Sequence, residues 1–461
     1  MNLEAVKYVY LLGAGGIGMS ALGRYFLHRG IPVAGYDRTS VSFTDQLQKE
    51  GMQLVFEDRA ELIPESLFAD DVKDNVLVIY TPAIPKENII LNTLINRGFK
   101  LYKRAEVLGI LSKGHPTLAV AGTHGKTTTS TLVAHILKSA ALAPVAFLGG
   151  VSVNYGTNYL SGNNDSFLVA EADEYDRSFL QLFPDSSIIT STDADHLDIY
   201  GKADALLDSF AQFARQTSED GVLLVKAGLN LPNDILERAI TYHTTENADV
   251  MLADCILVGD KYQFSIKIGK YEITNLELGL PGMHNVENAI AAAAICYFNG
   301  VSEDQIRIAL KSFSGVKRRF EYIIRRDDLT FIDDYAHHPE ELRACIGSVK
   351  AIYPNKKITG VFQPHLYSRT RDFYDGFAAS LSMLDEVILL DIYPARELPI
   401  EGVSSAALLE KISHPAKRLV SKTELVDVIA TLQLEVLLTL GAGDIDALVE
   451  PIHERLNTMN R

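Results

Sequence analysis

A glycine–lysine–threonine sequence near residue 125 has the residue types of a phosphate-binding loop. Residues 119–132 read AVAGTHGKTTTSTL. In the usual pattern, G-x-x-x-x-G-K-[ST], another glycine stands five positions before Gly125, but this chain has Val120 there. The apolar run 117–122 predicts a buried strand, and the apolar stripe after Lys126 predicts a helix. A loop between a strand and a helix N-terminus can hold phosphates, so we expect a phosphate site despite the altered spacing.

Acidic clusters follow the next two predicted strands. Residues 166–170 lead into Glu171, and residues 186–190 lead into a segment that contains His196. Hard cations prefer oxygen ligands, and the threonine beside a phosphate-loop lysine commonly binds Mg²⁺. Either acidic cluster alone is more typical of a solvated loop than of a metal site. Together with the loop they predict a metal site at Thr127, Glu171 and His196.

The N-terminal segment has the layout of a dinucleotide-binding unit. A short apolar strand at 8–12 leads into a G-x-G-x-x-G motif, a helical pattern, a second strand at 32–36 and an acid. The motif glycines and the acid are Gly13, Gly15, Gly18 and Asp37. Such glycines let the backbone approach a pyrophosphate, and the acid is placed to accept a hydrogen bond from a ribose or base. NAD is the default ligand, although any nucleotide with a pyrophosphate fits the same physics.

Two further segments carry polar side chains that suit ligand binding. In 278–298, an asparagine-rich start precedes an alanine-rich helix, and His284, Asn285 and Asn288 could face a base or ribose. Asn285 could instead be only the N-cap of that helix. In the last third, polar residues follow one predicted strand after another, at 329–333, 357–362, 386–392 and 434–440. Ligands of open parallel sheets bind at the carboxyl ends of the strands, which predicts a substrate site there.

Length and charge limit the possible classes of protein. The chain has 461 residues and a net charge of −16, which suggests about three domains and argues against a nucleic-acid surface. The longest apolar run is too short to span a bilayer. The N-terminus goes straight into a strand pattern without a secretory signal, so we expect a cytoplasmic protein. The oligomeric state cannot be read from the sequence.

These motifs predict an α/β fold of three domains. We expect a Rossmann-like N-terminal domain (1–110), a central domain of the P-loop ATPase type with a mostly parallel sheet (111–316) and a Rossmann-like C-terminal domain (317–461). A hydride-transfer enzyme needs no phosphate loop with Lys126 and Glu171, and a switch GTPase needs neither flanking domain. The combination favours a ligase, in which phosphate from a nucleotide activates a carboxylate toward an amine.

Motifs along nearly the whole chain, in order, carry a resemblance to one family. They read GTHGKTTT, EADEYDRSFL, DADHLDIYG, PGMHNVENA, KRRFE, DDYAHHPEE, FQPH followed by SRTR, and a final GAGDI. With them the chain resembles the Mur ligases of peptidoglycan synthesis. The loop motif alone is shared with folate and cyanophycin ligases, whereas GAGGIGMS, DDYAHHP, FQPH and GAGDI together are specific.

The resemblance implies a reaction and a set of substrates. It implies that ATP and Mg²⁺ convert the lactyl carboxylate of UDP-N-acetylmuramate to an acyl phosphate, which L-alanine then attacks. The first domain would thus bind the UDP of that sugar and not NAD. A murein tripeptide ligase that acts on the same sugar, and a nucleotide-dependent binding module without turnover, are the alternatives.

The resemblance also implies residue roles. Residues implied at ATP are Gly122, Thr123, His124, Gly125, Lys126, Thr127, Thr128, His284, Asn285, Asn288 and Arg319. Residues implied at the UDP sugar are Gly13, Gly15, Gly16, Gly18, Asp37, Thr81, Pro82 and Ala83. Residues implied at the amino acid are Tyr335, His337, His365 and Arg369. Lys126, Arg319 and His337 are the implied catalytic side chains, His337 as a base or only as a residue that orients the amine.

The chain departs from the family pattern at two places. Leu366 follows the FQPH histidine where some members carry arginine, so one possible carboxylate contact is missing. Residues 203–225 contain no lysine, so we expect none of the carbamylated lysine that some related ligases use.

Overall fold

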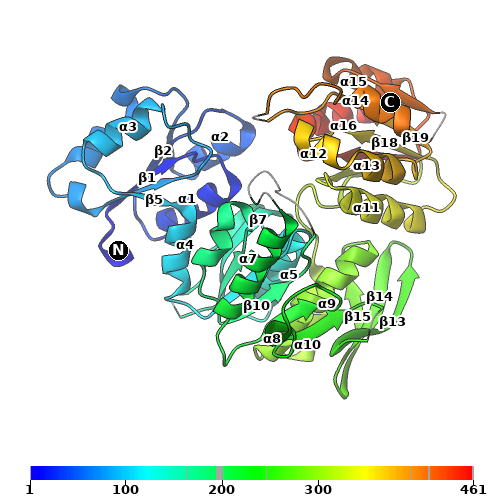
Figure 1. Ribbon diagram of the computed structural model, residues 1–461, viewed down its shortest axis with the longest axis horizontal. Coiled ribbons are helices and arrows are strands. Elements are labelled where there is room, and N and C mark those ends of the chain that lie inside the picture. The colour runs from blue at the N-terminus through cyan, green and yellow to red at the C-terminus, as the bar shows by residue number, and fades with distance from the viewer. Residues whose placement is uncertain are drawn as a thin grey trace. The chain divides into compact units, whose positions relative to one another are not determined.

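The computed structural model of the chain describes residues 2–163, 165–193, 200, 202–245, 247–395, 397–413 and 416–458. Within these residues the strands form three sheets, of five, ten and six strands, that follow one another along the sequence. Helices flank the sheets (Figure 1). The described chain therefore has the α/β class that the sequence predicts.

The first sheet is parallel and has the strand order β3-β2-β1-β4-β5. Its strands are β1 (Tyr8–Leu12), β2 (Val33–Tyr36), β3 (Gln53–Val55), β4 (Val76–Tyr80) and β5 (Leu101–Lys103). The helices and 3₁₀ turns are η1 (Leu3–Ala5), α1 (Ile17–His28), α2 (Ser42–Lys49), η2 (Ala60–Leu62), η3 (Glu65–Phe68), η4 (Lys73–Asn75), α3 (Ile89–Asn96) and α4 (Arg104–Ser112). Side chains alternate along β1, so that Val9 and Leu11 pack with α1 while Tyr10 packs with α3. This is the predicted Rossmann-like arrangement.

The second sheet has the order β15-β14-β13-β12-β11-β10-β6-β9-β7-β8. Its strands are β6 (Thr117–Ala121), β7 (Val145–Ser152), β8 (Thr157–Leu160), β9 (Leu168–Glu171), β10 (Ser186–Ile189), β11 (Leu223–Lys226), β12 (Ile240–His243), β13 (Val250–Val258), β14 (Lys261–Ile268) and β15 (Tyr271–Leu278). The helices are α5 (Lys126–Ser139), η5 (Tyr175–Gln181), α7 (Ala203–Gln216), α8 (Asn233–Leu236), α9 (Met283–Phe298) and α10 (Glu303–Ser312). Strand β6 pairs with β9 and with β10 in parallel. The pairing of β7 with β8 at the end of the sheet is antiparallel.

The third sheet has the order β16-β17-β21-β18-β19-β20. Its strands are β16 (Glu321–Arg325), β17 (Thr330–Asp334), β18 (Ile358–Phe362), β19 (Glu386–Leu389), β20 (Lys417–Leu419) and β21 (Val436–Leu440). The helices are α11 (Pro339–Ile352), α12 (Tyr367–Asp372), α13 (Tyr374–Leu381), α14 (Ser405–Lys411), α15 (Lys422–Ala430), η6 (Asp444–Leu448) and α16 (Val449–Thr458). All of the strand pairs are parallel except β16 with β17. The predicted strand at 386–392 is shorter in the structure, because β19 ends at Leu389.

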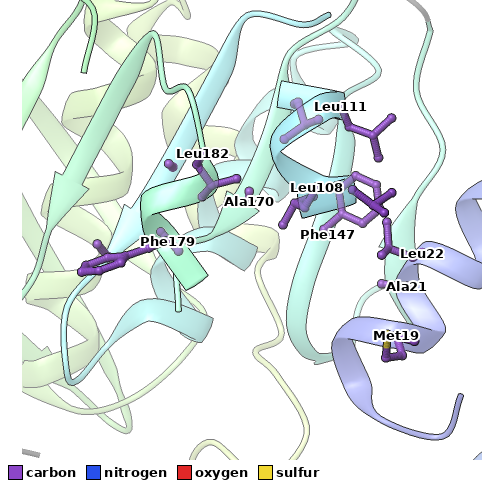
Figure 2. Close-up of a cluster of buried hydrophobic side chains, with 14 of the residues drawn as sticks. Met19, Ala21, Leu22, Leu108, Leu111, Phe147, Ala170, Phe179 and Leu182 are labelled. Carbon is purple, nitrogen blue, oxygen red and sulfur yellow. The ribbon is translucent and has the colours of Figure 1, made fainter. Parts of the chain in front are cut away.

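The chain divides into two compact units. The first is Met1–Asp254, Ser265–Leu276 and Asn288–Phe313, and the second is Cys255–Phe264, Glu277–Glu287 and Ser314–Arg461. Within the first unit, one hydrophobic core joins the first sheet to the second. Figure 2 shows this core, with labels on Met19, Ala21, Leu22, Leu108, Leu111, Phe147, Ala170, Phe179 and Leu182. Helix α1, which follows the first glycine loop, thus packs against β7, and α4 packs against η5.

No helix among the described residues is both long enough and apolar enough to cross a membrane.

Candidate active site

The glycine–lysine loop lies between β6 and α5, where the sequence predicts it. Gly125 is the N-cap of α5 and has a φ of 81°, a left-handed conformation that favours glycine. Gly122 has a φ of +133°, and a Cβ there would lie 2.1 Å from Thr190 Oγ1. Residues 122 and 125 must therefore be glycine for this loop to close over the start of the helix. The loop exposes backbone N–H groups at the N-terminus of a fourteen-residue helix, which suits an anion.

The segment after β10 holds this loop in place. Ser191 Oγ accepts a hydrogen bond from the His124 backbone N–H at 2.7 Å and lies 2.8 Å from Thr123 Oγ1. Thr190 Oγ1 donates to the carbonyls of Ala121 and His124. Thr190 and Ser191 were not predicted from the sequence, because they stand 66 to 69 residues from their partners.

Lys126 lies next to a buried carboxylate, and its own side chain is 13% exposed. Its Nζ lies 3.0 Å from Glu174 Oε1 and 2.8 Å from Oε2, and it donates to the Gly122 carbonyl at 2.5 Å. Burial opposes the charged lysine, yet the carboxylates of Glu174, Glu171 and Asp173 raise the pKa of Lys126 above its ordinary value. The side chain is thus an ammonium at neutral pH. The sequence placed Glu174 in the same acidic cluster as Glu171 but did not predict this pairing.

Glu171 ends β9 and lies against the backbone of β7. A Cβ at Gly149 would be 2.0 Å from Glu171 Oε2 and 2.4 Å from Oε1, so the glycine makes room for the carboxylate. Among the described residues, no three His, Cys, Asp or Glu side chains are grouped to hold a metal ion. Mg²⁺ is usually held by one or two carboxylates together with substrate phosphates and water, so Glu171 with the Thr127 hydroxyl fits its chemistry. His196, the third predicted ligand, lies outside the described residues.

Helix α9 contributes to both units. Asn288 lies in the first unit beside the phosphate loop, because a Cβ at Gly125 would be 2.7 Å from Asn288 Oδ1. Asn285 is inside the first turn of α9, which begins at Met283, and its Nδ2 donates to the Pro281 carbonyl. The alternative that Asn285 is the N-cap is therefore wrong. The backbone already turns into the helix at Gly282, whose φ is +102°.

The first glycine loop connects β1 to α1. Gly13 has a φ of +89°, and a Cβ there would lie 2.4 Å from Thr81 Cγ2. Gly15 N–H donates to Asp37 Oδ2 at 2.8 Å, and Gly16 caps α1. The structure thus brings together Gly13 with Thr81 and Gly15 with Asp37, all of them residues that the resemblance implies at the UDP sugar. Asp37 holds the loop itself, a contact that the sequence analysis did not anticipate.

The other residues of this set follow the same loop and β4. A Cβ at Gly18 would lie 2.6 Å from Arg104 Nη1. Ala83 N–H donates to Thr81 Oγ1 at 3.4 Å, which makes a turn through Pro82 after β4.

In the second unit, a buried carboxylate organises the residues before and after β17. Asp334 accepts hydrogen bonds from the backbone N–H groups of Phe320 and Ala336, both at 2.7 Å. Burial raises the pKa of Asp334 to about 6, although Arg319 acts against the shift. The Arg319 guanidinium lies over the Tyr335 ring, 4.8 Å from its centroid. The structure therefore brings Arg319 and Tyr335 into contact.

His337, His365 and Arg369 form a second contact group. His337 Nδ1 lies 3.0 Å from the Tyr335 carbonyl, and the ring centroids of His337 and His365 are 6.3 Å apart. Arg369 Nη1 lies 3.1 Å from His365 Nδ1. Three of the four residues predicted at the amino acid are thus ring neighbours, and the fourth touches His365. Tyr393, which follows the predicted strand at 386–392, stacks on His365 with ring centroids 5.6 Å apart.

Glu341 is a further residue that the sequence analysis missed. It accepts hydrogen bonds from the backbone N–H groups of His337 and His338 at 3.0 and 3.2 Å. This is a capping box at the start of α11, with His338 as the N-cap and Pro339 as the first helical residue. The spacing of histidine and glutamate in HHPEE was the available signal.

His284 is half-buried near these elements in the second unit. Its Nδ1 lies 3.3 Å from Ser348 Oγ, and its ring packs near Phe320. Burial lowers the pKa of His284 to about 4, with Glu341 acting against the shift and Arg319 in favour of it. His284 is therefore a neutral imidazole at neutral pH.

Comparisons with known proteins cover almost the whole chain. Three family models match: "Mur ligase family, catalytic domain" at residues 8–116, "Mur ligase middle domain" at 120–296 and "Mur ligase, glutamate ligase domain" at 318–444. The chain is 48% identical over 458 residues to a UDP-N-acetylmuramate–L-alanine ligase of Parabacteroides distasonis, covering 99% of this chain and 98% of the relative.

Solved structures agree with this likeness. The UDP-N-acetylmuramate–alanine ligase MurC of Thermotoga maritima superposes with a TM-score of 0.81 at 28% identity, over 98% of this chain and 99% of that one. A murein peptide ligase of Psychrobacter arcticus superposes with a TM-score of 0.72 at 22% identity, over 98% of both chains, which shows a shared fold.

Proposed function

Because the chain belongs to the Mur ligase family, we propose that it is an ATP-dependent ligase that joins L-alanine to the lactyl carboxylate of UDP-N-acetylmuramate in peptidoglycan synthesis. The observation that carries this proposal is the full-length likeness to ligases of that name. The fold and the phosphate loop agree with it, since the loop sets a charged lysine at a helix N-terminus.

We assign the three segments to three substrates. Residues 1–110 would bind the UDP sugar, 111–316 ATP, and 317–461 the amino acid. The glycine loop at Gly13–Gly18, closed by Asp37, suits the pyrophosphate of a UDP sugar. The cluster of Tyr335, His337, His365 and Arg369 offers rings and a guanidinium for a small amino acid.

The reaction has two steps. The sugar carboxylate is a poor electrophile because its negative charge repels an amine. An oxygen of the carboxylate attacks the γ-phosphorus, the bond to the β–γ bridging oxygen breaks, and ADP leaves. The alanine nitrogen then attacks the acyl carbon and loses a proton. The bond between the acyl carbon and the phosphate oxygen breaks, and inorganic phosphate leaves with the electron pair of that bond.

Phosphoryl transfer depends mostly on positioning and charge neutralisation. Lys126 is charged and fixed at the loop, and Arg319 supplies a further positive charge in our proposal. Mg²⁺, with Thr127, Glu171 and His196 as proposed ligands, would neutralise phosphate charge when bound. The backbone N–H groups of the loop orient the phosphates.

Amide formation requires a neutral amine and a proton acceptor. His337 Nδ1 faces the Tyr335 carbonyl, which can only accept, so Nδ1 carries the hydrogen and Nε2 the lone pair. We propose that His337 Nε2 takes the proton from the alanine nitrogen, a task suited to a group with a reference pKa of ~6.5. We further propose that the enzyme works in the cytoplasm, where ATP is available.

The test supplies purified protein with ATP, Mg²⁺ and UDP-N-acetylmuramate and compares acceptors by ADP release. We expect release with L-alanine and little with the tripeptide L-alanyl-γ-D-glutamyl-meso-diaminopimelate. Preference for the tripeptide would replace the proposal by a murein peptide ligase. No release with either amine would leave only a binding module.

A further inference from the structure

Glu174 is a buried carboxylate that the reaction described above does not use. Its side chain is 1% exposed, against 13% for that of Lys126. The Tyr200 hydroxyl donates to the Glu174 backbone carbonyl at 2.6 Å, which fixes this part of the chain. The carboxylate is therefore held in position against the lysine of the phosphate loop.

The lysine ammonium is directed toward its own loop and Glu174. Besides Glu174, Nζ contacts the carbonyls of Gly122 at 2.5 Å and Thr123 at 3.4 Å. An ammonium has three donors. A nucleotide phosphate that pairs with Lys126 must share it with these acceptors or displace one of them.

Among the acceptors of the Lys126 ammonium, Glu174 is the one that a bound phosphate would destabilise most. A buried carboxylate that loses its cation carries a large desolvation penalty. It also repels a phosphate brought to the same ammonium, since like charges in a buried site interact strongly. A divalent cation beside the phosphates would offset both effects, and Glu171, only three residues before Glu174, is the proposed metal ligand.

We propose that Glu174 is a positioning residue that holds Lys126 in the loop and competes with nucleotide phosphates for it, so that tight ATP binding requires a divalent cation. This inference rests on the proposed function, because it takes ATP as the ligand of the loop. It predicts that the charge of Glu174, more than its shape, makes ATP binding depend on Mg²⁺.

The experiment measures ATP affinity by calorimetry, in Mg²⁺ and in EDTA, for the wild-type protein and Glu174→Gln. Without the sugar acceptor no transfer consumes the ATP. We expect the wild-type protein to bind ATP much more weakly in EDTA. We expect Glu174→Gln to bind ATP in EDTA on the order of tenfold more tightly than wild type, which narrows the gap between the two conditions. An unchanged gap, or weaker binding of the variant in EDTA, would overturn the inference.

Two further variants control for charge and folding. Glu174→Asp keeps the charge, so its ATP affinity is expected to depend on Mg²⁺ as in wild type. Loss of that dependence in Glu174→Asp would contradict the role of charge. Asp234→Asn removes a carboxylate from an exposed pair with Arg215 in the same unit and should leave both affinities unchanged. If the wild-type protein bound no ATP in either condition, the proposed function itself would fail, whereas ATP binding with no effect of Glu174→Gln would refute only this inference.

Discussion

The phosphate-loop region and the region around His284 each shield a titratable side chain from much of the solvent, but the two side chains are held in opposite charge states. Lys126 is charged, because neighbouring carboxylates raise its pKa against the effect of burial. His284 is neutral, because burial lowers its pKa to about 4 and the nearby Glu341 does not compensate. Placement of the counter-charge, and not burial alone, therefore decides the charge state of a buried group.

This difference matches the chemistry proposed for each region. Phosphoryl transfer needs positive charge that is present throughout, which a lysine paired with Glu174 provides. Amide formation instead needs an acceptor for the proton of the alanine amine, and a neutral imidazole can take that proton.

The largest effect is expected for Lys126→Ala. We expect kcat to fall on the order of a thousandfold or more, because a fixed charge at the transferred phosphate is lost. Binding of UDP-N-acetylmuramate should persist, since the loop Gly13–Gly18 belongs to a different sheet. ADP release and calorimetry with the sugar measure the two quantities. Equal loss of sugar binding in a folded variant would show that the two sites are not separate.

His337→Asn tests the proton acceptor that we propose for amide formation. We expect kcat to fall about a hundredfold, with KM for ATP unchanged, because the proton acceptor for the amine is lost. The residual rate of the variant should no longer fall on the acid side of the pH–rate profile, because the group whose protonation causes that fall is gone. If the variant keeps the limb and only raises KM for alanine, His337 orients the substrate and another group takes the proton.

His284→Gln should alter how stability depends on pH. In the wild-type protein the unfolded chain binds a proton at His284 below its ordinary pKa of ~6.5, while the folded chain does not until about pH 4. The contribution of His284 to stability is thus present above pH ~6.5 and is lost as the pH falls toward about 4. At pH 5 the free energy of unfolding has lost about 2 kcal/mol of this contribution.

Urea unfolding at pH 7 and pH 5 measures this effect. The wild-type protein should lose about 2 kcal/mol more than His284→Gln between the two values. His453→Gln, on α16 with a side chain that is 32% exposed, is the control and should behave like wild type. Equal losses in wild type and His284→Gln would show that His284 is not held neutral.

The smallest effect is expected for Asp234→Asn. The Arg215–Asp234 pair is exposed, with side-chain exposures of 53% and 59%, so solvent screens it. We expect no measurable change in the urea midpoint and full ligase activity. A clear fall in the urea midpoint would mean that an exposed charge pair stabilises the fold as a shielded one does. That result would contradict the difference expected between the Lys126–Glu174 pair and the exposed pair.

The sequence predicted the local parts of this site better than its long-range contacts. The strand, loop and helix around Gly125 follow from glycine positions and apolar periodicity within some twenty residues. The partnership of Lys126 with Glu174 does not, because Glu171, Asp173 and Glu174 stand in one acidic run. Which of them faces the lysine depends on the backbone, which takes positive φ at Asp176 just afterwards.

Helix starts and cross-strand partners show the same limit. Asn285 was a plausible N-cap by residue type, yet α9 begins at Met283 because the chain turns at Gly282. The contact of Ser191 with the phosphate loop is set by the pairing of β6 with β10. Only the folded sheet brings these residues together.

Positional isotope exchange tests the central claim most directly. ATP labelled in the β–γ bridge is incubated with the protein, Mg²⁺ and UDP-N-acetylmuramate, without alanine. If the sugar carboxylate takes the γ-phosphoryl group first, the freed ADP rotates its β-phosphate and re-forms ATP with the label moved to a non-bridging position. We predict exchange that requires the sugar but not alanine. Exchange only when alanine is present, with the sugar and Mg²⁺ saturating, would contradict a separate acyl-phosphate step.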